Sequence, residues 1–171
     1  SVKKILIEPN KLLRQVSELV EKVGDEEREL MNDMLDTMYD APGIGLAAIQ
    51  IGVPKRIIVM DISRDEDKKE PRYFVNPVIK NRNEEKVKYE EGCLSVPDQF
   101  AEIERPNTCE VEYLDYDGKK KLLKADGLLA TCIQHEIDHL EGILFIDYLS
   151  KLKKSMIIKK LSKIKVNREI F

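Results

Sequence analysis

The sequence predicts an α+β fold, and three observations lead to that class. Two β-branched runs bounded by polar turns occur in the first half of the chain, KRIIVMDI (55–62) and RYFVNPVI (72–79). The segment 109–113 alternates apolar with acidic residues, as a half-buried strand does. Helical apolar spacing occurs at 25–40 and around HEIDHL. We therefore expect small antiparallel or mixed β-sheets packed around a central helix that carries HEIDH, with a further helix at the C-terminus.

The first helix is expected over 25–40, DEERELMNDMLDTMYD. Its apolar residues recur at intervals of three and four, and acidic residues crowd its first turn. Pro42 and Gly43 then end it. After the strand at 109–113, the pair Asp117-Gly118 predicts a hairpin turn into KKKLLK.

Two helices are expected in the last third of the chain. One begins near Asp126 and runs through HEIDHL to about Gly142. The other is amphipathic and basic and occupies much of 148–165. Its apolar stripe should pack partly on the domain and contains Leu152, Ile157, Ile158, Leu161 and Ile164. Its basic side chains should lie largely in water, namely Lys153, Lys154, Lys160, Lys163 and Lys165.

Length and composition indicate one soluble domain. The 171 residues show no repeat or flexible linker, so we expect a single domain over 1–171 whose residues 148–171 form a basic helix and tail. No apolar run approaches the ~20 residues that span a bilayer. The start, SVKKILIEPN, lacks the apolar core of a signal peptide, so we expect a cytoplasmic protein without a membrane partner. Three cysteines, an odd number, do not predict a disulfide framework.

Charge is unevenly distributed along the chain. Residues 151–171 carry seven Lys and one Arg against one Glu, a local charge of +7, which leaves −10 on the rest of a chain whose net charge is −3. A solvated helix face is the plain interpretation of such a segment. A membrane-surface helix is disfavoured because no aromatic residue precedes Phe171 within it. Binding to nucleic acid through phosphate contacts is the third interpretation.

The segment HEIDH contains both histidines of the chain. On a helix, His135 and His139 lie one turn apart on the same face, so two imidazoles can bind one metal ion. Glu136 lies beside them in the H-E-x-x-H pattern, whose glutamate is the general base of metal-dependent hydrolases. An ordinary helix with two incidental histidines is the alternative.

A metal centre of this kind needs a third protein ligand, and the sequence restricts the choice. The position of a third histidine in the extended protease pattern is Phe145, so that ligand must be Cys, Asp or Glu. Cys132 would require ligands spread over two helical turns, roughly 10 Å, and Cys109 falls in a strand pattern typical of a core residue. Cys93 remains, in the segment YEEGCLSVP (89–97), which we expect to be irregular and closely packed, although taken alone it fits a buried free thiol. Cys93 with two histidines would leave one tetrahedral position open, as catalytic sites do.

A glycine-rich segment, APGIGLAAIQIG (41–52), is the third candidate. It is not a phosphate-binding loop, because it follows a helix and lacks the third glycine and the lysine. Its glycines suit a backbone held close to a ligand, and Gln50 offers an amide donor for a developing oxyanion. A packed turn with an exposed glutamine is an equally simple interpretation.

Taken together, GIGLAAIQ (43–50), EGCLS (91–95) and QHEIDH (134–139) resemble, in order and separation, the motifs of peptide deformylases. The resemblance covers the chain from its N-terminus to its last helix and is strongest to the bacterial type with a long C-terminal helix. It implies that Cys93, His135 and His139 bind one divalent metal and that Glu136 is the general acid/base. It also implies that Gln50 and the backbone N–H of Leu94 hold the oxyanion. The residues that it implies for the substrate pocket are Ile44, Gly45, Glu91, Gly92 and Leu128.

The resemblance further implies a substrate and partners. The substrate is the N-formyl-methionyl end of newly made polypeptides, from which formate is released, and the basic C-terminal helix would dock on the ribosome. Several relatives carry an arginine seven residues after the metal cysteine, where this chain has Phe100. A thiolate and two imidazoles suit Fe²⁺, Zn²⁺, Ni²⁺ or Co²⁺, and the family commonly uses Fe²⁺. Nothing in the sequence demands more than a monomer.

Two rival functions share parts of this pattern. A zinc-dependent peptidase would need a third histidine or a helical glutamate downstream, but Glu141 lies too near His139 and Glu169 lies in the basic tail. A non-enzymatic module with a structural metal would need a fourth protein ligand.

Overall fold

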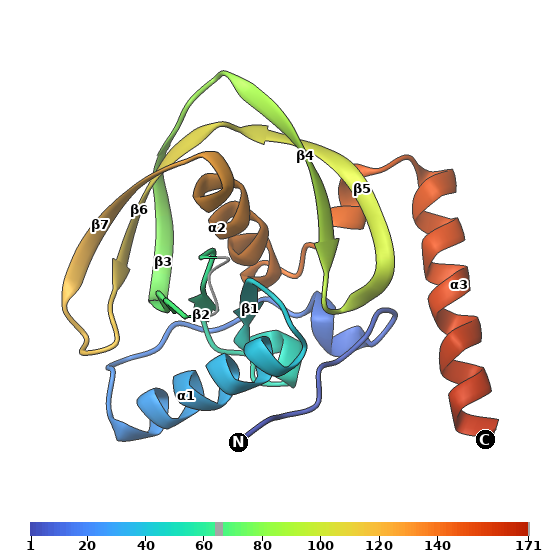
Figure 1. The fold of residues 1–171 in the computed structure, drawn as a ribbon, viewed down its shortest axis with the longest axis horizontal. Helices are drawn as coiled ribbons and strands as arrows, with labels where there is room; N and C mark the ends of the chain where they lie inside the picture. Colours follow the sequence, from blue (N-terminus) through green and yellow to red (C-terminus); the bar gives the residue numbers. More distant parts are fainter. Residues whose placement is uncertain (64–66, 171) are drawn as a thin grey trace.

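The computed structural model describes the backbone of residues 1–63 and 67–170, and the side chains of 1–63 and 67–163. In chain order, the elements are η1 (Lys11–Arg14), α1 (Asp25–Asp40), β1 (Gly45–Ala47), η2 (Ala48–Ile51), β2 (Ile57–Met60), β3 (Arg72–Arg82), β4 (Lys86–Cys93), β5 (Val96–Pro106), β6 (Thr108–Leu114), β7 (Lys120–Asp126), α2 (Gly127–Leu140), η3 (Phe145–Tyr148) and α3 (Lys151–Ile170). Figure 1 shows the strands curving around α2, with α1 below and α3 at one side. The α+β prediction, including the central and C-terminal helices, is confirmed.

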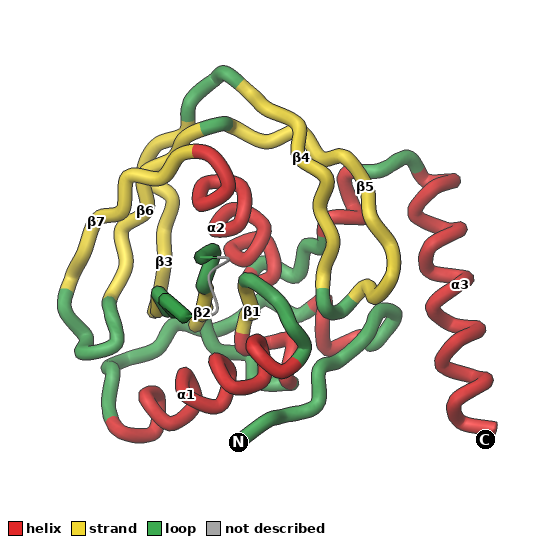
Figure 2. Tube along the Cα trace, viewed as in Figure 1, coloured by secondary structure: helices red, strands yellow, loops and turns green. Residues whose placement is uncertain are grey.

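The strands form two antiparallel sheets. One has five strands in the order β1-β2-β3-β6-β7, and the other is the hairpin β4-β5 (Figure 2). The predicted strand segments correspond to β2, β3 and β6, and Gly118 takes the positive φ of 84° that the predicted hairpin turn requires. The hairpin β4-β5 refines the sequence interpretation, because 89–97 is the end of two paired strands, with an irregular register between Glu91 and Cys93 before the turn.

Strand β2 explains how the large sheet separates two cores. Ile58 and Met60 point to one face of the strand and Ile57 and Val59 to the other, because strand side chains alternate. The first pair packs against α2, whereas the second pair packs against α1. A central strand covered on both faces must be apolar throughout, and all four residues of β2 are buried.

Helix α1 has the bounds that its sequence predicts, and it buries Met31, Met34 and Met38 against the sheet. These methionines follow helical spacing, whereas the three acidic residues of its first turn stay near its positive end. The glycine in the turn directly after α2, Gly142, is restricted by packing as well. Gly142 has a φ of +74°, and a Cβ there would lie 2.3 Å from the carbonyl oxygen of Arg14.

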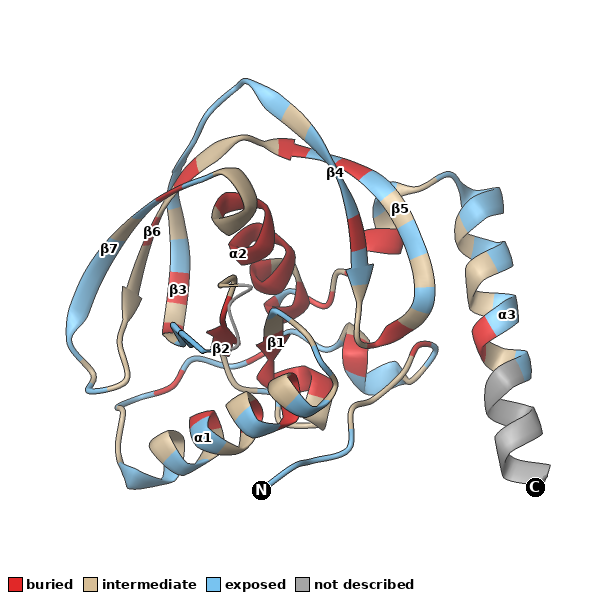
Figure 3. Cartoon of the chain, viewed as in Figure 1, coloured by how far each residue is buried: buried red, intermediate tan, exposed pale blue. Residues whose placement is uncertain are grey.

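Helix α2 runs through the centre of the molecule and is buried along most of its length (Figure 3). Its apolar residues contact the five-stranded sheet, and its polar residues face the hairpin β4-β5. A third core, beneath β5, joins Val96 and Ile103 to Phe145 and to Leu161 of α3. None of the described helices is long and apolar enough to cross a bilayer.

The stripe expected on the C-terminal helix is only partly confirmed. Ile157, Ile158 and Leu161 pack on the domain as expected, but Leu152 is 72% exposed, which is a correction. Lys154 is also not a free surface side chain, because its ammonium lies 2.7 Å from Asp147. The side chains expected at 164 and 165 lie outside the described residues.

Candidate metal centre

The two histidines lie on one face of α2, as their spacing predicts. Their ring centroids are 5.1 Å apart, and both side chains are buried. Helix α2 begins at Gly127, directly after the end of β7, so its position is fixed by the sheet. The buried histidines therefore form a rigid half of a binding site.

Cys93 supplies the other half from the hairpin β4-β5. It is the last residue of β4 and pairs with Val96 across a two-residue turn. Its sulfur lies 3.3 Å from Nε2 of His139. Among the described residues, Cys93, His135 and His139 form one group whose ligand atoms lie within 4.8 Å of one another.

This geometry fits a single divalent metal ion. Bonds of about 2.0–2.3 Å in a tetrahedron place neighbouring ligand atoms roughly 3.6 Å apart, close to the sulfur–nitrogen distance found here. A thiolate with two imidazoles is a donor set for borderline-soft transition metals rather than for Mg²⁺ or Ca²⁺. Cys109 and Cys132 are buried free thiols outside this group. Within the described part of the chain, the site thus has three protein ligands.

Glu91 orients the first histidine. Its Oε1 lies 2.8 Å from Nδ1 of His135, which leaves Nε2 of that ring for a metal. Arg105 in turn holds both carboxylate oxygens of Glu91, at 2.7 and 3.0 Å, and reaches Asp138 at 2.9 Å. Burial raises the pKa of Glu91, but the hydrogen bonds from His135 and Arg105 outweigh burial, so the pKa lies below its ordinary value. Glu91 is therefore held as a carboxylate.

Sequence reasoning missed Arg105. Its side chain is 4% exposed, on the same inward face of β5 as Ile103. Ile103 and Arg105 are two positions apart, so on a strand they lie on the same face. This spacing could have placed the arginine inside the protein, where a buried cation needs acidic partners.

Glu136 lies beside the metal ligands with a free carboxylate oxygen. The residue is 4% exposed, and its Oε1 has no hydrogen-bond partner in the described structure. Burial raises its pKa to about 7. Gly45 makes room for it, because a Cβ on Gly45 would lie 2.5 Å from Oε2 of Glu136. The second glycine of the GIG motif is thus explained by close backbone approach.

Gln50 is buried and fixed from both ends, contrary to a packed turn with an exposed glutamine. Its Oε1 accepts a hydrogen bond of 2.9 Å from the N–H of Ala47. Its Nε2 donates to Oγ of Ser95 at 3.0 Å and lies 3.5 Å from the sulfur of Cys93. The side-chain amide therefore points its donor end at the metal ligands. Leu94 follows Cys93 in the hairpin turn.

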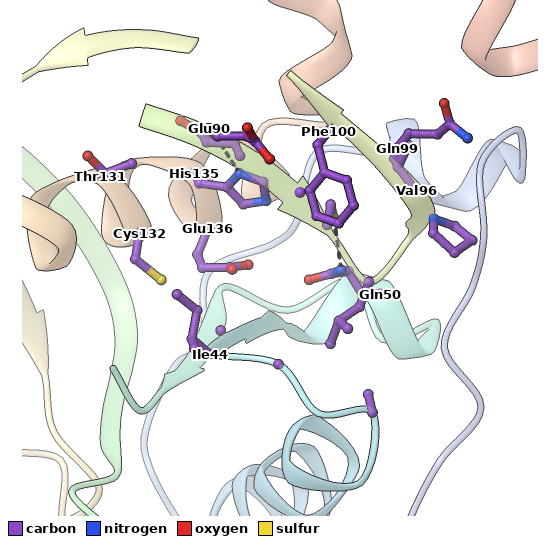
Figure 4. Close-up of a pocket in the computed structure, with 18 of the residues that line it drawn as sticks. Ile44, Gln50, Glu90, Val96, Gln99, Phe100, Thr131, Cys132, His135 and Glu136 are labelled. Atoms are coloured by element: carbon purple, nitrogen blue, oxygen red, sulfur yellow. Dashed lines mark hydrogen bonds and ion pairs between the residues drawn. The ribbon is translucent and has the colours of Figure 1, made fainter. Parts of the chain in front are cut away.

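A pocket of about 620 Å³ joins these groups, and Figure 4 shows His135 and Glu136 projecting into it from α2. The pocket contains every residue that the sequence resemblance suggests except His139, which is fully buried behind it. The predicted residues that line it are Ile44, Gly45, Gln50, Glu91, Gly92, Cys93, Leu94, Leu128, His135 and Glu136. Phe100, at the position where relatives carry an arginine, also lines it, and so do Thr131 and Cys132, which were not predicted to do so.

The pocket has the size and composition of a small-ligand site. Apolar side chains alternate with a few fixed polar groups around the metal ligands. Phe100 lies at the rim and is 65% exposed, with its ring against Gly92. Such a site can hold an apolar side chain next to a polarised, hydrolysable bond.

Comparisons with known proteins agree with this geometry. The family model described as polypeptide deformylase matches residues 2–155. A peptide deformylase of Pelagibacter ubique is 88% identical over 170 residues, covering 99% of each chain, and that of Rhizobium meliloti is 56% identical over 163 residues, covering 95% of this chain and 94% of its own. The crystal structure of peptide deformylase from Ehrlichia chaffeensis is 45% identical, with a TM-score of 0.91 over 96% of this chain and 97% of its own. This chain therefore belongs to the peptide deformylase family.

Proposed function

We propose that the pocket residues Glu136, Gln50 and Leu94 carry out the deformylation to which the family is dedicated. The reaction is hydrolysis of the N-formyl group from the N-terminal formyl-methionine of new polypeptides, with release of formate. Cys93, His135 and His139 hold the divalent metal, and we propose Fe²⁺ as the ion used in the cell, with Zn²⁺, Ni²⁺ and Co²⁺ as substitutes. When bound, such an ion polarises a carbonyl oxygen and lowers the pKa of a coordinated water toward neutrality.

Glu136 moves the protons of the reaction. Its unpartnered Oε1 accepts a proton from the attacking water and later returns it to the departing methionine amine. A carboxyl whose pKa is raised by burial suits both steps, because it can take up and give back a proton near neutral pH. Gly45 allows this carboxylate to reach the reacting bond.

Gln50 and the backbone N–H of Leu94 stabilise the negative charge that develops on the formyl oxygen. The contacts from Ala47 and to Ser95 hold the Gln50 amide in one orientation and leave its second N–H for the oxyanion. Donors fixed before the reaction are effective because they need no reorganisation, and losing one typically costs ~10²–10³ in rate.

The remaining pocket residues bind the methionine side chain and the first peptide units. Ile44 and Leu128 supply apolar contacts, whereas Gly45 and Gly92 let the substrate backbone approach closely. Glu91 lines the same pocket, but we assign it to His135 because its carboxylate is already bound to that ring and to Arg105.

The basic C-terminal helix is proposed to dock on the ribosome. Three of its apolar residues anchor it to the domain. Lys159 and Lys163 stay exposed and form no ion pair with the described residues, so they are available to rRNA phosphates. We further propose that the protein works as a monomer in the cytoplasm, where formylated chains are made.

The observation that carries this function is the buried, unpartnered carboxylate of Glu136 beside a Cys-His-His ligand set. The test is to incubate the metal-loaded protein with formyl-Met-Ala-Ser, acetyl-Met-Ala-Ser and Met-Ala-Ser. We expect formate and Met-Ala-Ser from the first peptide alone. Cleavage of the unformylated peptide would instead indicate a peptidase, and no product from any peptide would indicate a structural metal site.

A further inference from the structure

A second groove begins where the active-site pocket ends. It lies between β5 and α3, has a volume of about 760 Å³ and shares Gln99 and Phe100 with the active-site pocket. Figure 1 shows α3 alongside β5, and residues of the two elements lie close together. We call this cavity the β5–α3 groove. The two cavities are therefore contiguous at Gln99 and Phe100.

One wall of the groove is the free edge of a strand. Six consecutive residues of β5, 99–104, line it. The groove also includes Lys86 and Lys88 of β4, so it covers part of the hairpin surface as well as the side of β5 that faces α3. Strand β5 pairs with β4 alone, and no other described strand occupies this edge. An unpaired strand edge is a template for an extended peptide.

The groove is also lined by exposed apolar side chains. Phe100 is 65%, Tyr148 51% and Met156 52% exposed, and all three line it. Large apolar groups left in water around one groove mark a surface that binds another chain.

Its charge favours an acidic occupant. Lys86, Lys88, Lys153 and Lys160 line the groove, and none forms an ion pair with a described residue. The groove is lined by four lysines and by two acidic residues, Glu102 and Glu104, so it has an excess of positive charge.

We propose that the β5–α3 groove binds the stretch of the formylated polypeptide that follows the residues held in the active-site pocket. This inference rests on the proposed function and names a further part of its substrate. The polypeptide lies extended along β5, with apolar side chains against Phe100 and Met156 and acidic side chains toward the lysines of both walls. The groove therefore favours long formylated chains with apolar and acidic residues downstream of the start.

The test compares peptides that share one start. Formyl-Met-Ala-Ser fills only the pocket, whereas a peptide of about twelve residues, at ~3.3 Å per extended residue, reaches the length of the groove. Two long peptides are used, one continuing with alternating Leu and Glu and one with Gly and Ser. We expect kcat/KM for the Leu-Glu peptide to exceed that for the tripeptide by roughly tenfold, mainly through a lower KM. The Gly-Ser peptide should resemble the tripeptide.

A pair of matched variants assigns this advantage to the groove. Lys153→Glu with Lys160→Glu reverses two groove lysines, whereas Lys159→Glu with Lys163→Glu makes the same charge change on α3 away from the groove. Both pairs change exposed residues outside the catalytic pocket, so activity on the tripeptide should be unchanged. The advantage of the Leu-Glu peptide should disappear in the first pair and persist in the second.

Several outcomes would overturn the proposal. Equal kcat/KM for long and short peptides in the unmodified protein would do so, as would an equal effect of both variant pairs. Loss of ribosome co-sedimentation in the groove pair with the long-peptide advantage intact would assign the groove to the ribosome instead. Failure of the proposed function is a separate result, because it would abolish turnover of the tripeptide as well.

Discussion

Nδ1 of His135 and Oε1 of Glu91 lie 2.8 Å apart, although the two residues are 44 positions apart in the chain. Arg105 fixes the carboxylate from its other side. The metal ligand on α2 is thus held by a carboxylate on β4 and a guanidinium on β5, so the hairpin that carries Cys93 also orients the histidine.

The first prediction concerns this support. Glu91→Gln keeps the size of the side chain but removes the charge that orients His135 and satisfies Arg105. Metal affinity should fall about 10–100-fold, as measured by competition with a chelator. Glu90→Gln is the matched control, because Glu90 is exposed and the hydrogen bonds to His135 and Arg105 come from Glu91. Equal affinities of the two variants would contradict the role given to Glu91.

The second prediction distinguishes the three cysteines. Cys93→Ala should lose the metal, whereas Cys109→Ala and Cys132→Ala should keep it, because only the first sulfur lies among the ligand atoms. Metal content per chain after gel filtration measures this directly. Full occupancy in Cys93→Ala would be incompatible with the site described.

The third prediction separates chemistry from binding. Glu136→Gln preserves the shape of the side chain but cannot accept a proton. The variant should bind metal normally and lose at least about 10²–10⁴-fold in kcat on formyl-Met-Ala-Ser. Near-normal turnover would mean that another group accepts the proton.

The fourth prediction tests a packing constraint beside the site. Gly127 and Gly142 both have positive φ, but only Gly142 faces backbone atoms where a Cβ would be. Gly127→Ala should cost about 1–2 kcal/mol of unfolding free energy through strain alone. Gly142→Ala should cost clearly more, because Arg14 must also move. Urea denaturation compares the two, and equal losses would refute the packing argument.

The fifth prediction concerns the C-terminal helix. Lys159→Glu with Lys163→Glu should weaken co-sedimentation with ribosomes and lower the salt dependence of binding, because each lysine that contacts a phosphate releases counterions. Lys121→Glu with Lys124→Glu, on β7, is the control with the same charge change. Deleting 152–171 should abolish binding and spare activity on the tripeptide. Undiminished, salt-insensitive binding after deletion would exclude this docking surface.

The sequence predicted elements well where local rules determined them. Helix α1 has acidic residues in its first turn and methionines at helical spacing, and its bounds agree with the prediction. The hairpin β4-β5 was missed because Val96 and Ile103 are its only fully buried apolar residues, so the alternation Ala101-Glu102-Ile103-Glu104 in β5 is short and weak.

The site was predictable only in part, for a geometric reason. His135 and His139 are four residues apart on a helix, so their common face follows from the sequence. Cys93 could be reached only by eliminating other residues, because its contact with His139 depends on how the hairpin folds over α2. Arg105 could not be predicted as a partner of Glu91, since burial of a cation depends on tertiary structure.

Cys93 and His139 are separated by 46 positions in the chain. Cys93 belongs to the two-stranded sheet β4-β5, which is separate from the five-stranded sheet, and His139 belongs to α2. A metal held by both would therefore act as a cross-link that closes a long loop of the chain, in addition to its part in the chemistry. Because such an ion binds the folded chain preferentially, it raises the free energy of unfolding as its concentration increases. Thermal stability of this protein should accordingly report on the supply of the metal, so that a cell short of the ion would lose folded enzyme as well as active sites.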